Sequence, residues 1–271
     1  MTSRVIRLGA VSYLNVRPLV YGLEARRDLI SLRFDVPAIC ARLLADGEID
    51  LGMVPSISWL DRPGDRIVPG VCIGSEGPVA SVALFTRKPM ADIRTIALDT
   101  SSRTSAGLVK ILCARRFDIA PGFIDAAPDL PAMLAVADAA LLIGDPALFV
   151  DHRAHGAEKI DLGAEWTAMT GLPFVWAFWS GPAGAIAPSD VEVLVQAAHD
   201  GMAHADAIAG DYCQSTPERI PMAARYLREN LRFDLSPRAI EGLETYYREA
   251  AAVGLVAQAR PLEFFERDAR S

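Results

Sequence analysis

The chain has 271 residues, of which 51% are hydrophobic and 23% are charged, and its formal net charge is -7. Since a domain takes roughly 150 residues, this length predicts about two domains. The composition is globular and excludes disordered, collagen-like and small disulfide-rich proteins. A mildly acidic chain without a basic run is also a poor candidate for binding nucleic acid or an anionic membrane surface. An anionic ligand must therefore be held by local donors.

The cysteines and the apolar runs indicate the compartment. Cys40, Cys72, Cys113 and Cys213 form no CxxC pair and no dense framework, so we expect buried free thiols in a reducing compartment. The first residues lack the apolar stretch of a secretion signal, and no apolar run reaches the roughly 18 residues of a membrane span. We therefore expect a soluble, cytoplasmic protein without a membrane partner.

Strand-like and helical patterns alternate through the first part of the chain. The expected elements are strand Val5–Val11, helix Val16–Glu24, strand Ser31–Val36, helix Pro37–Ala45 and strand Ile49–Val54, followed by two strands, Ile67–Ile73 and Val79–Thr86. The initial β-α-β-α-β order favours a mostly parallel sheet with helices on both faces.

A second unit of the same kind begins near residue 90, and the C-terminal third reads as helical. The expected elements are strand Thr95–Leu98, helix Ser102–Phe117, strand Gly122–Asp125, helix Leu130–Ala137, strand Ala139–Ile143, and helices Ser189–Ala209, Thr216–Asn230 and Ser236–Val253. Thr216 and Ser236 each precede a proline, which is typical of a capping hydroxyl before the first helical turn.

Two α/β units without a flexible linker predict two lobes joined directly by crossing segments. We expect a discontinuous first lobe of residues 1–88 plus 180–271, in which the C-terminal helices return to the first unit, and a second lobe of residues 89–179. The hinge would lie near residues 85–92 and 176–182. The cleft between the lobes is then the expected ligand site.

Several common functional motifs are missing from the sequence. It has no GxGxxG or GxxxxGK[ST] motif for a nucleotide, no HExxH motif for a metal and no GxSxG elbow for a hydrolase nucleophile. The four histidines are expected to be solvated surface residues: His152, His155, His199 and His204.

Polar residues instead follow the predicted strands, at the edge where open α/β sheets bind ligands. After the first strand, Asn15 either caps the next helix or offers its amide to a ligand, and Arg17 is either a fork for a carboxylate or an outward-facing residue. The run from 99 to 105 crowds hydroxyls at a strand-to-helix junction, which predicts a cap or an anion on the free N–H groups. Arg103, in that run, is expected at the cleft rim or in a structural role.

Three further polar residues and one aromatic run complete the candidates. Ser56 and Asp145 each follow a predicted strand and are most simply helix caps. Ser81 lies inside an apolar run, so its buried hydroxyl needs a partner, such as the backbone. The run Leu172–Trp179 predicts a core strand near the crossing, with one or two rings walling the cleft.

Five segments together resemble the chorismate dehydratase family, which catalyses the first step of the futalosine route to menaquinone. They are Ser12–Leu19, Gly52–Ser56, Ser101–Ser105, Ile143–Leu148 and Gly171–Val175. The resemblance implies a fold like a type 2 periplasmic binding protein. It also implies removal of water from chorismate to give 3-[(1-carboxyvinyl)oxy]benzoate, without metal or organic cofactor and with the substrate's enolpyruvyl carboxylate as the base.

With this resemblance, Asn15 is expected to be the catalytic residue, orienting the substrate or its leaving hydroxyl. Thr104, Ser105 and the N–H groups of their helix would hold a carboxylate. The remaining substrate contacts would come from Ser12, Ser56, Ser81, Ser102 and Asp145. The expected partner is a dianionic small molecule, and the protein is a monomer or homodimer.

Two alternatives stay open at this stage. One is a non-catalytic module that binds a small anion, because the same fold serves both purposes. The other is the sister enzyme of the same route, which cleaves dehypoxanthine futalosine and usually has a Pro-Asn-Asp loop after its first strand. Here that loop reads Leu14-Asn15-Val16, which favours the dehydratase.

Overall fold

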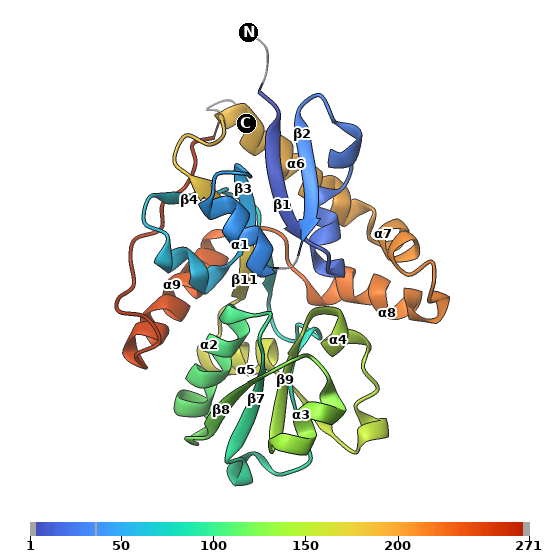
Figure 1. Ribbon diagram of the computed structural model, residues 1–271, viewed down its shortest axis with the longest axis vertical. Coiled ribbons are helices and arrows are strands. Elements are labelled where there is room, and N and C mark those ends of the chain that lie inside the picture. Colours follow the sequence, from blue (N-terminus) through green and yellow to red (C-terminus); the bar gives the residue numbers. More distant parts are fainter. Residues whose placement is uncertain (1–3, 36, 268–271) are drawn as a thin grey trace.

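The computed structural model describes residues 4–35 and 37–267 as two α/β lobes, one above the other in Figure 1. The first lobe is built on a six-stranded sheet of order β2-β1-β3-β11-β4, with β5 also paired to β11. Its strands are β1 Ile6–Val11, β2 Ile30–Asp35, β3 Leu51–Pro55, β4 Asp65–Ile67, β5 Ile73–Ser75 and β11 Phe174–Pro182. Val36, the last residue of the second expected strand, lies outside the described residues.

The second lobe is built on a five-stranded sheet of order β10-β6-β9-β7-β8. Its strands are β6 Val82–Thr86, β7 Thr95–Asp99, β8 Gly122–Ala126, β9 Ala139–Ile143 and β10 Glu158–Asp161. The two-lobed α/β class is as predicted, but both sheets are mixed and not mostly parallel. In each sheet the strand that arrives from the other lobe, β6 or β11, runs antiparallel to its neighbours.

Helices cover both sheets. They are α1 Pro37–Ala45, α2 Arg103–Leu112, α3 Leu130–Val136, α4 Gly144–Phe149, α5 Leu162–Thr170, α6 Pro188–Ala203, α7 Ala205–Tyr212, α8 Ile220–Arg225 and α9 Pro237–Ala252. Ser102 and Ser236 cap α2 and α9 by accepting from the amides three residues on, as expected. Thr216 makes no side-chain cap bond and precedes only a short 3-10 turn, so that expectation is wrong.

Proline and glycine explain several differences from the predicted elements. The expected helix Val16–Glu24 is instead a pair of 3-10 segments, η1 Leu14–Val20 and η2 Leu23–Ala25, because Pro18 has no N–H for a helical ladder. The expected strand Ile67–Ile73 is interrupted after Ile67, where Pro69 and the left-handed Gly70 (φ 78°) break the pairing.

Further differences lie in the middle and the C-terminal third. The expected helix Ser189–Ala209 breaks into α6 and α7 at His204, which leaves helical geometry (φ -112°, ψ 24°). The expected helix Thr216–Asn230 is α8 between a 3-10 turn and a π turn, Tyr226–Asn230. Strand β10 and helix α5 were not predicted.

The chain changes sheet earlier than expected on both occasions. It passes from β5 to β6 through residues 76–81 and returns through α5 and residues 171–173 to β11. The sheets therefore place β6 in the second lobe and the whole of β11 in the first, one strand away from the expected boundaries at 88 and 179. Because a strand is short, its hydrophobic pattern alone does not show which sheet it joins.

Large aromatic side chains fill the core. Trp59, Trp166, Trp179 and Tyr246 are fully buried, and Trp166 packs edge-on against Tyr246 of α9. Helix α9 contacts both β11 of the first lobe and α2 of the second. The four cysteines are free and buried, as expected. Within residues 4–35 and 37–267 there is no helix of the length and apolarity needed to cross a membrane.

Candidate active site between the lobes

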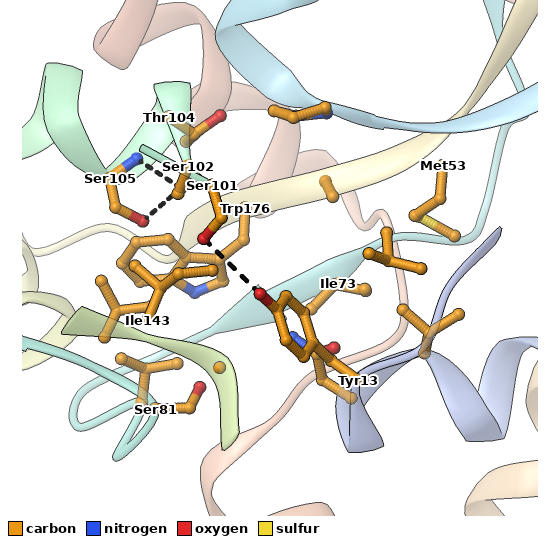
Figure 2. Close-up of a pocket in the computed structure, with 18 of the residues that line it drawn as sticks. Tyr13, Met53, Ile73, Ser81, Ser101, Ser102, Thr104, Ser105, Ile143 and Trp176 are labelled. Atoms are coloured by element: carbon orange, nitrogen blue, oxygen red, sulfur yellow. Dashed lines mark hydrogen bonds between the residues drawn. The ribbon is translucent and has the colours of Figure 1, made fainter. Parts of the chain in front are cut away.

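A cavity lies between the two lobes and encloses about 650 Å³ of space, including its opening to solvent. Its first-lobe wall includes Tyr13, Asn15, Met53, Ile73 and Trp176. Its second-lobe wall includes Ser101, Ser102, Thr104, Ser105, Ile143 and Gly144. Figure 2 shows Tyr13 pointing across this cavity toward Ser101.

Asn15 reaches the cavity from η1, whose position is fixed from two sides. Helix α6 packs closely on η1 because Gly201 has no side chain, and a Cβ there would overlap the Pro18 carbonyl oxygen. From the second lobe, the Asp145 carboxylate accepts a hydrogen bond from the Leu14 amide at 3.2 Å. The two contacts hold the segment that carries Asn15 against the mouth of the second lobe.

The side-chain oxygen of Asn15 is the polar atom of the cavity that most needs a ligand. Oδ1 is buried and accepts no hydrogen bond from any described residue. Asn15 lies inside η1 and does not cap it, since the residue before η1 is Tyr13 and no side-chain cap bond forms there. A buried acceptor without a partner costs about 1–3 kcal/mol, so a ligand that donates to it gains that amount.

The start of α2 forms a cradle of mutually bonded hydroxyls. Ser102 Oγ donates to Ser105 Oγ at 2.9 Å and accepts from the Ser105 amide at 3.2 Å. Because Ser105 Oγ accepts this bond, its own proton is available to a ligand. Thr104 Oγ1 lies 3.4 Å from Ser56 Oγ and accepts from the Ile57 amide, so it ties the lobes together beside the cavity.

Ser81 is presented to the cavity by a strained turn on the first crossing. Ala80 has a left-handed backbone (φ 64°), which is unfavourable for a residue with a Cβ. The Asp161 carboxylate holds this turn by accepting from the amides of Val79 and Ala80 at 3.0 and 2.6 Å. Lys159 Nζ donates to the Ala80 carbonyl. These bonds explain why β6 begins at Val82 and not at Val79.

The partner of the Ser81 hydroxyl is another side chain and not the backbone. Ser81 is 1% exposed, and its Oγ lies 2.7 Å from the hydroxyl oxygen of Tyr226, which is 2% exposed. Burial raises the pKa of Tyr226, so the phenol stays protonated at neutral pH.

Apolar rings form the rest of the wall. The ring of Tyr13 lies against Gly144, where a Cβ would come within 3.2 Å of it, and Gly144 adopts the left-handed backbone (φ 61°) that favours glycine. Burial raises the pKa of Tyr13, which keeps its hydroxyl a donor. Trp176 is buried and donates its indole N–H to Ser75 Oγ at 3.0 Å. These rings exclude water from one side of a bound ligand.

The structure brings five of the eight expected site residues to the cavity: Asn15, Ser81, Ser102, Thr104 and Ser105. The other three do not line it. Ser12 is exposed, and only its carbonyl is engaged, by the Tyr212 hydroxyl. Ser56 is fully buried beneath Thr104 and is not a side-chain cap.

Asp145 is also displaced from the expected role. It caps no helix with its side chain, and instead accepts hydrogen bonds from Leu14 N and from the Tyr212 hydroxyl. Burial raises its pKa, against the lowering effect of these two bonds. Asp145 therefore links the lobes behind the cavity wall.

Four residues that line or support the cavity are not among the site residues that the sequence predicts. Tyr13 and Ser101 stand in the segments that were singled out and are next to predicted residues. Trp176 belongs to the aromatic run that was expected to wall a cleft. Tyr226 gave no signal, because nothing in the sequence relates it to Ser81.

Neither arginine of the two segments enters the cavity. The Arg17 guanidinium stacks over Phe34 at 4.4 Å and over Tyr212 at 5.3 Å. Arg103 is exposed and forms an ion pair with Asp61 at 2.7 Å, in a neighbouring hollow that shares Ser101 with the cavity. No Lys, Arg, His, Asp or Glu of the described residues lines the cavity itself. Any anion bound there is held by neutral hydroxyl, amide and N–H donors.

Over the same described residues, no three His, Cys, Asp or Glu side chains come together as a metal-binding group. The groups that line the cavity are hydroxyls, one amide and apolar side chains that include aromatic rings. This donor set suits an organic anion.

Two α/β lobes that share a ligand cavity between two crossings define the periplasmic-binding-protein type of fold. Solved structures with this arrangement include the periplasmic aliphatic sulphonate binding protein of Escherichia coli (17% identity, TM-score 0.64, covering 98% of this chain and 96% of that one). A Candida albicans protein described as having the generic periplasmic binding protein fold is similar as well (11% identity, TM-score 0.68, 98% and 99%). So is a protein of Archaeoglobus fulgidus (16% identity, TM-score 0.71, 93% and 98%).

The chain belongs to the menaquinone biosynthesis family, whose model matches residues 6–252. It is 28% identical over 273 aligned positions to the chorismate dehydratase of Thermus thermophilus, covering 92% of this chain and 95% of that protein. The region that the family model matches, residues 6–252, contains every residue of the cavity.

Proposed function

We propose that this protein is a chorismate dehydratase, a carbon–oxygen lyase of menaquinone biosynthesis that acts in the cytoplasm. It removes water from chorismate and releases 3-[(1-carboxyvinyl)oxy]benzoate. Family membership and the Thermus thermophilus relative support the reaction. The observation that carries the assignment to this cavity is the buried, unpartnered Oδ1 of Asn15, flanked by hydroxyl donors from the other lobe.

The donors and acceptors of the cavity match those of the substrate. Chorismate is a dianion whose two carboxylates only accept hydrogen bonds, and its C4 hydroxyl is its single donor. We assign that hydroxyl to Asn15 Oδ1, which accepts no hydrogen bond from any described residue. A carboxylate fits at the start of α2, where the Ser105 hydroxyl and the free N–H groups of the first turn can donate to it.

The chemistry needs no protein base. Among the described residues, none that lines the cavity is a carboxylate or a histidine, and we assign removal of the C3 proton to the enolpyruvyl carboxylate of the substrate, as the family resemblance implies. The C3–H electron pair becomes a ring π bond, and the C4–O bond breaks. The departing hydroxide takes up the proton that the enolpyruvyl carboxylate has accepted, and leaves as water. Aromatisation drives the step, so the task of the protein is to hold the carboxylate and the hydroxyl in the reactive geometry.

The site is complete within one chain, since each wall comes from a lobe of the same molecule. We infer that the lobes close around the substrate, and Ser81 lies on one of the two crossings. We place the hinge of that closure at the crossings, residues 76–81 and 171–173.

The test is to mix the purified protein with chorismate and follow the ultraviolet spectrum and the products by chromatography. We expect the benzoate product to accumulate far beyond one molecule per protein. Stoichiometric binding without product would show a small-anion binding module instead. Untouched chorismate together with cleavage of a dehypoxanthine futalosine would show the sister activity. Either outcome would overturn the proposal.

A further inference from the structure

One carboxylate of the second lobe is bonded to two segments of the first. Asp145 lies in the first turn of α4, directly after β9. Its Oδ1 accepts a hydrogen bond from the Leu14 amide at 3.2 Å, and its Oδ2 accepts from the hydroxyl of Tyr212, the last residue of α7. Helix α7 packs on η1 and so belongs with the first lobe. Both bonds of this carboxylate therefore cross between the lobes.

The Leu14 amide needs an acceptor from outside its own segment. Leu14 is the first residue of η1, and the first N–H groups of a helix have no acceptor within the helix. The residue is fully buried, where an amide without a partner is unfavourable. Its neighbours on both sides, Tyr13 and Asn15, line the cavity. Asp145 therefore holds the backbone between two residues of the candidate site.

Tyr212 holds the same stretch of backbone at a second point. Its hydroxyl oxygen lies 3.0 Å from the Ser12 carbonyl oxygen, to which it can also donate. Ser12 and Leu14 are thus both tied to the pair formed by Asp145 and Tyr212. The pair fixes this backbone directly before Asn15.

We propose that Asp145 is a positioning residue for the dehydration. Its side chain sets the backbone that presents Asn15 Oδ1 to the C4 hydroxyl of the substrate. This inference rests on the proposed function. Asp145 is not among the residues that line the cavity, so it acts through Leu14 and Tyr212 and does not touch the substrate.

The first experiment compares Asp145→Ala with wild type in chorismate turnover. A misplacement of about 1 Å costs on the order of 10²-fold in rate, and loss of one support of η1 should cost part of this, roughly 10-fold in kcat, with a smaller change in KM. The matched control is Asp129→Ala, which removes a carboxylate that accepts from the Ala132 amide at 2.9 Å within the second lobe. Asp129→Ala should keep wild-type kcat. Equal losses in the two variants would overturn the inference.

Asp145→Asn separates positioning from charge. An amide at this position keeps an oxygen for the Leu14 amide and can donate an N–H to the Tyr212 oxygen, while the Tyr212 proton goes to the Ser12 carbonyl. Asp145→Asn should therefore retain most of the kcat that Asp145→Ala loses. Equal losses in Asp145→Asn and Asp145→Ala would show that the carboxylate acts by its charge or on the substrate itself, which would overturn the inference. A wild-type kcat in Asp145→Ala would do the same.

A second readout does not depend on turnover. The Leu14 amide should exchange with solvent deuterium faster in Asp145→Ala than in wild type, as followed by NMR, because its acceptor is gone. Exchange should stay near the wild-type rate in Asp145→Asn and in Asp129→Ala. If the wild type does not convert chorismate, the proposed function falls, while this readout still tests the bridge. An unchanged exchange rate in Asp145→Ala would refute it.

Discussion

The two walls of the cavity differ in whether their polar side chains have hydrogen-bond partners within the protein. On the second-lobe wall, the hydroxyls of Ser102 and Ser105 bond to each other, and Thr104 is bonded across to the first lobe. On the first-lobe wall, Asn15 keeps a buried oxygen without a partner. The hydroxyls of the second-lobe wall are bonded to protein groups and can also bind a ligand. On the first-lobe wall, Asn15 Oδ1 gains a partner when a ligand donates to it.

This difference separates stability from function. Hydroxyls that satisfy one another stabilise the start of α2 whether or not a ligand is present. The unpartnered oxygen of Asn15 destabilises the empty protein by about 1–3 kcal/mol and is relieved only by a donor. A substrate with one hydroxyl fits that requirement. Substitutions on the first-lobe wall should therefore mainly lower turnover, and substitutions on the second-lobe wall should mainly lower stability.

The largest effect is expected at Asn15. Asn15→Ala removes the acceptor that orients the C4 hydroxyl, and misplacement of a reacting group costs on the order of 10²-fold in rate. Turnover of chorismate should fall by that factor, while the melting temperature stays the same or rises because the unpartnered oxygen is gone. A variant with native turnover would place the chemistry elsewhere.

A second prediction concerns affinity for the product. The benzoate has lost the C4 hydroxyl, so it leaves Asn15 Oδ1 unpaired again. We expect the product to bind about 1–3 kcal/mol more weakly than the substrate when both are measured on the same Ser81→Ala variant, in which the loss of a substrate contact is expected to slow turnover. Calorimetry with both ligands checks this. Equal affinities would show that the hydroxyl does not meet Asn15.

A smaller effect is expected on the opposite wall. Ser102→Ala removes the N-cap of α2 and should lower the free energy of unfolding by about 1 kcal/mol, whereas Ser102→Gly should lower it by only a few tenths. Chemical unfolding of both variants measures the difference. Turnover should fall less than in Asn15→Ala. If Ser102→Ala proves the more damaging to turnover, the ranking of the two walls is reversed.

The smallest effect on turnover is expected at Asp138, which does not line the cavity. Hydrogen bonds from Lys88 and from the amides of Arg94 and Thr95 lower its pKa to about 2, from an ordinary value of 3.8. A lowered carboxyl pKa stabilises the fold above pH 3.8 and loses this effect as the pH falls toward about 2. In Asp138→Asn that part of the acid sensitivity should disappear, as measured by unfolding across this range. An unchanged acid profile would contradict the assignment.

Local signals let the sequence predict much of this molecule. The strand Ala139–Ile143 is found with its expected bounds, because five apolar residues lie between turn signals. The caps Ser102 and Ser236 and the cavity residues Asn15 and Ser105 also come from short motifs. Such features depend on neighbours along the chain.

What could not be predicted depends on distant partners. Val79 reads as strand, but the Asp161 carboxylate occupies its amide and that of Ala80. Asp145 reads as a cap, yet Leu14 and Tyr212 take its oxygens. No pattern within a single segment contains this information. The same reason hides Tyr226, which is linked to the site by a side-chain contact with Ser81 across the fold.

The most direct test of the account is the position of chorismate in the cavity. A crystal structure of the slow Ser81→Ala variant soaked with chorismate should show the ring between the lobes, with its C4 hydroxyl within hydrogen-bonding distance of Asn15 Oδ1 and a carboxylate at the start of α2. Chorismate bound outside this cavity, or with its hydroxyl turned away from Asn15, would contradict the account.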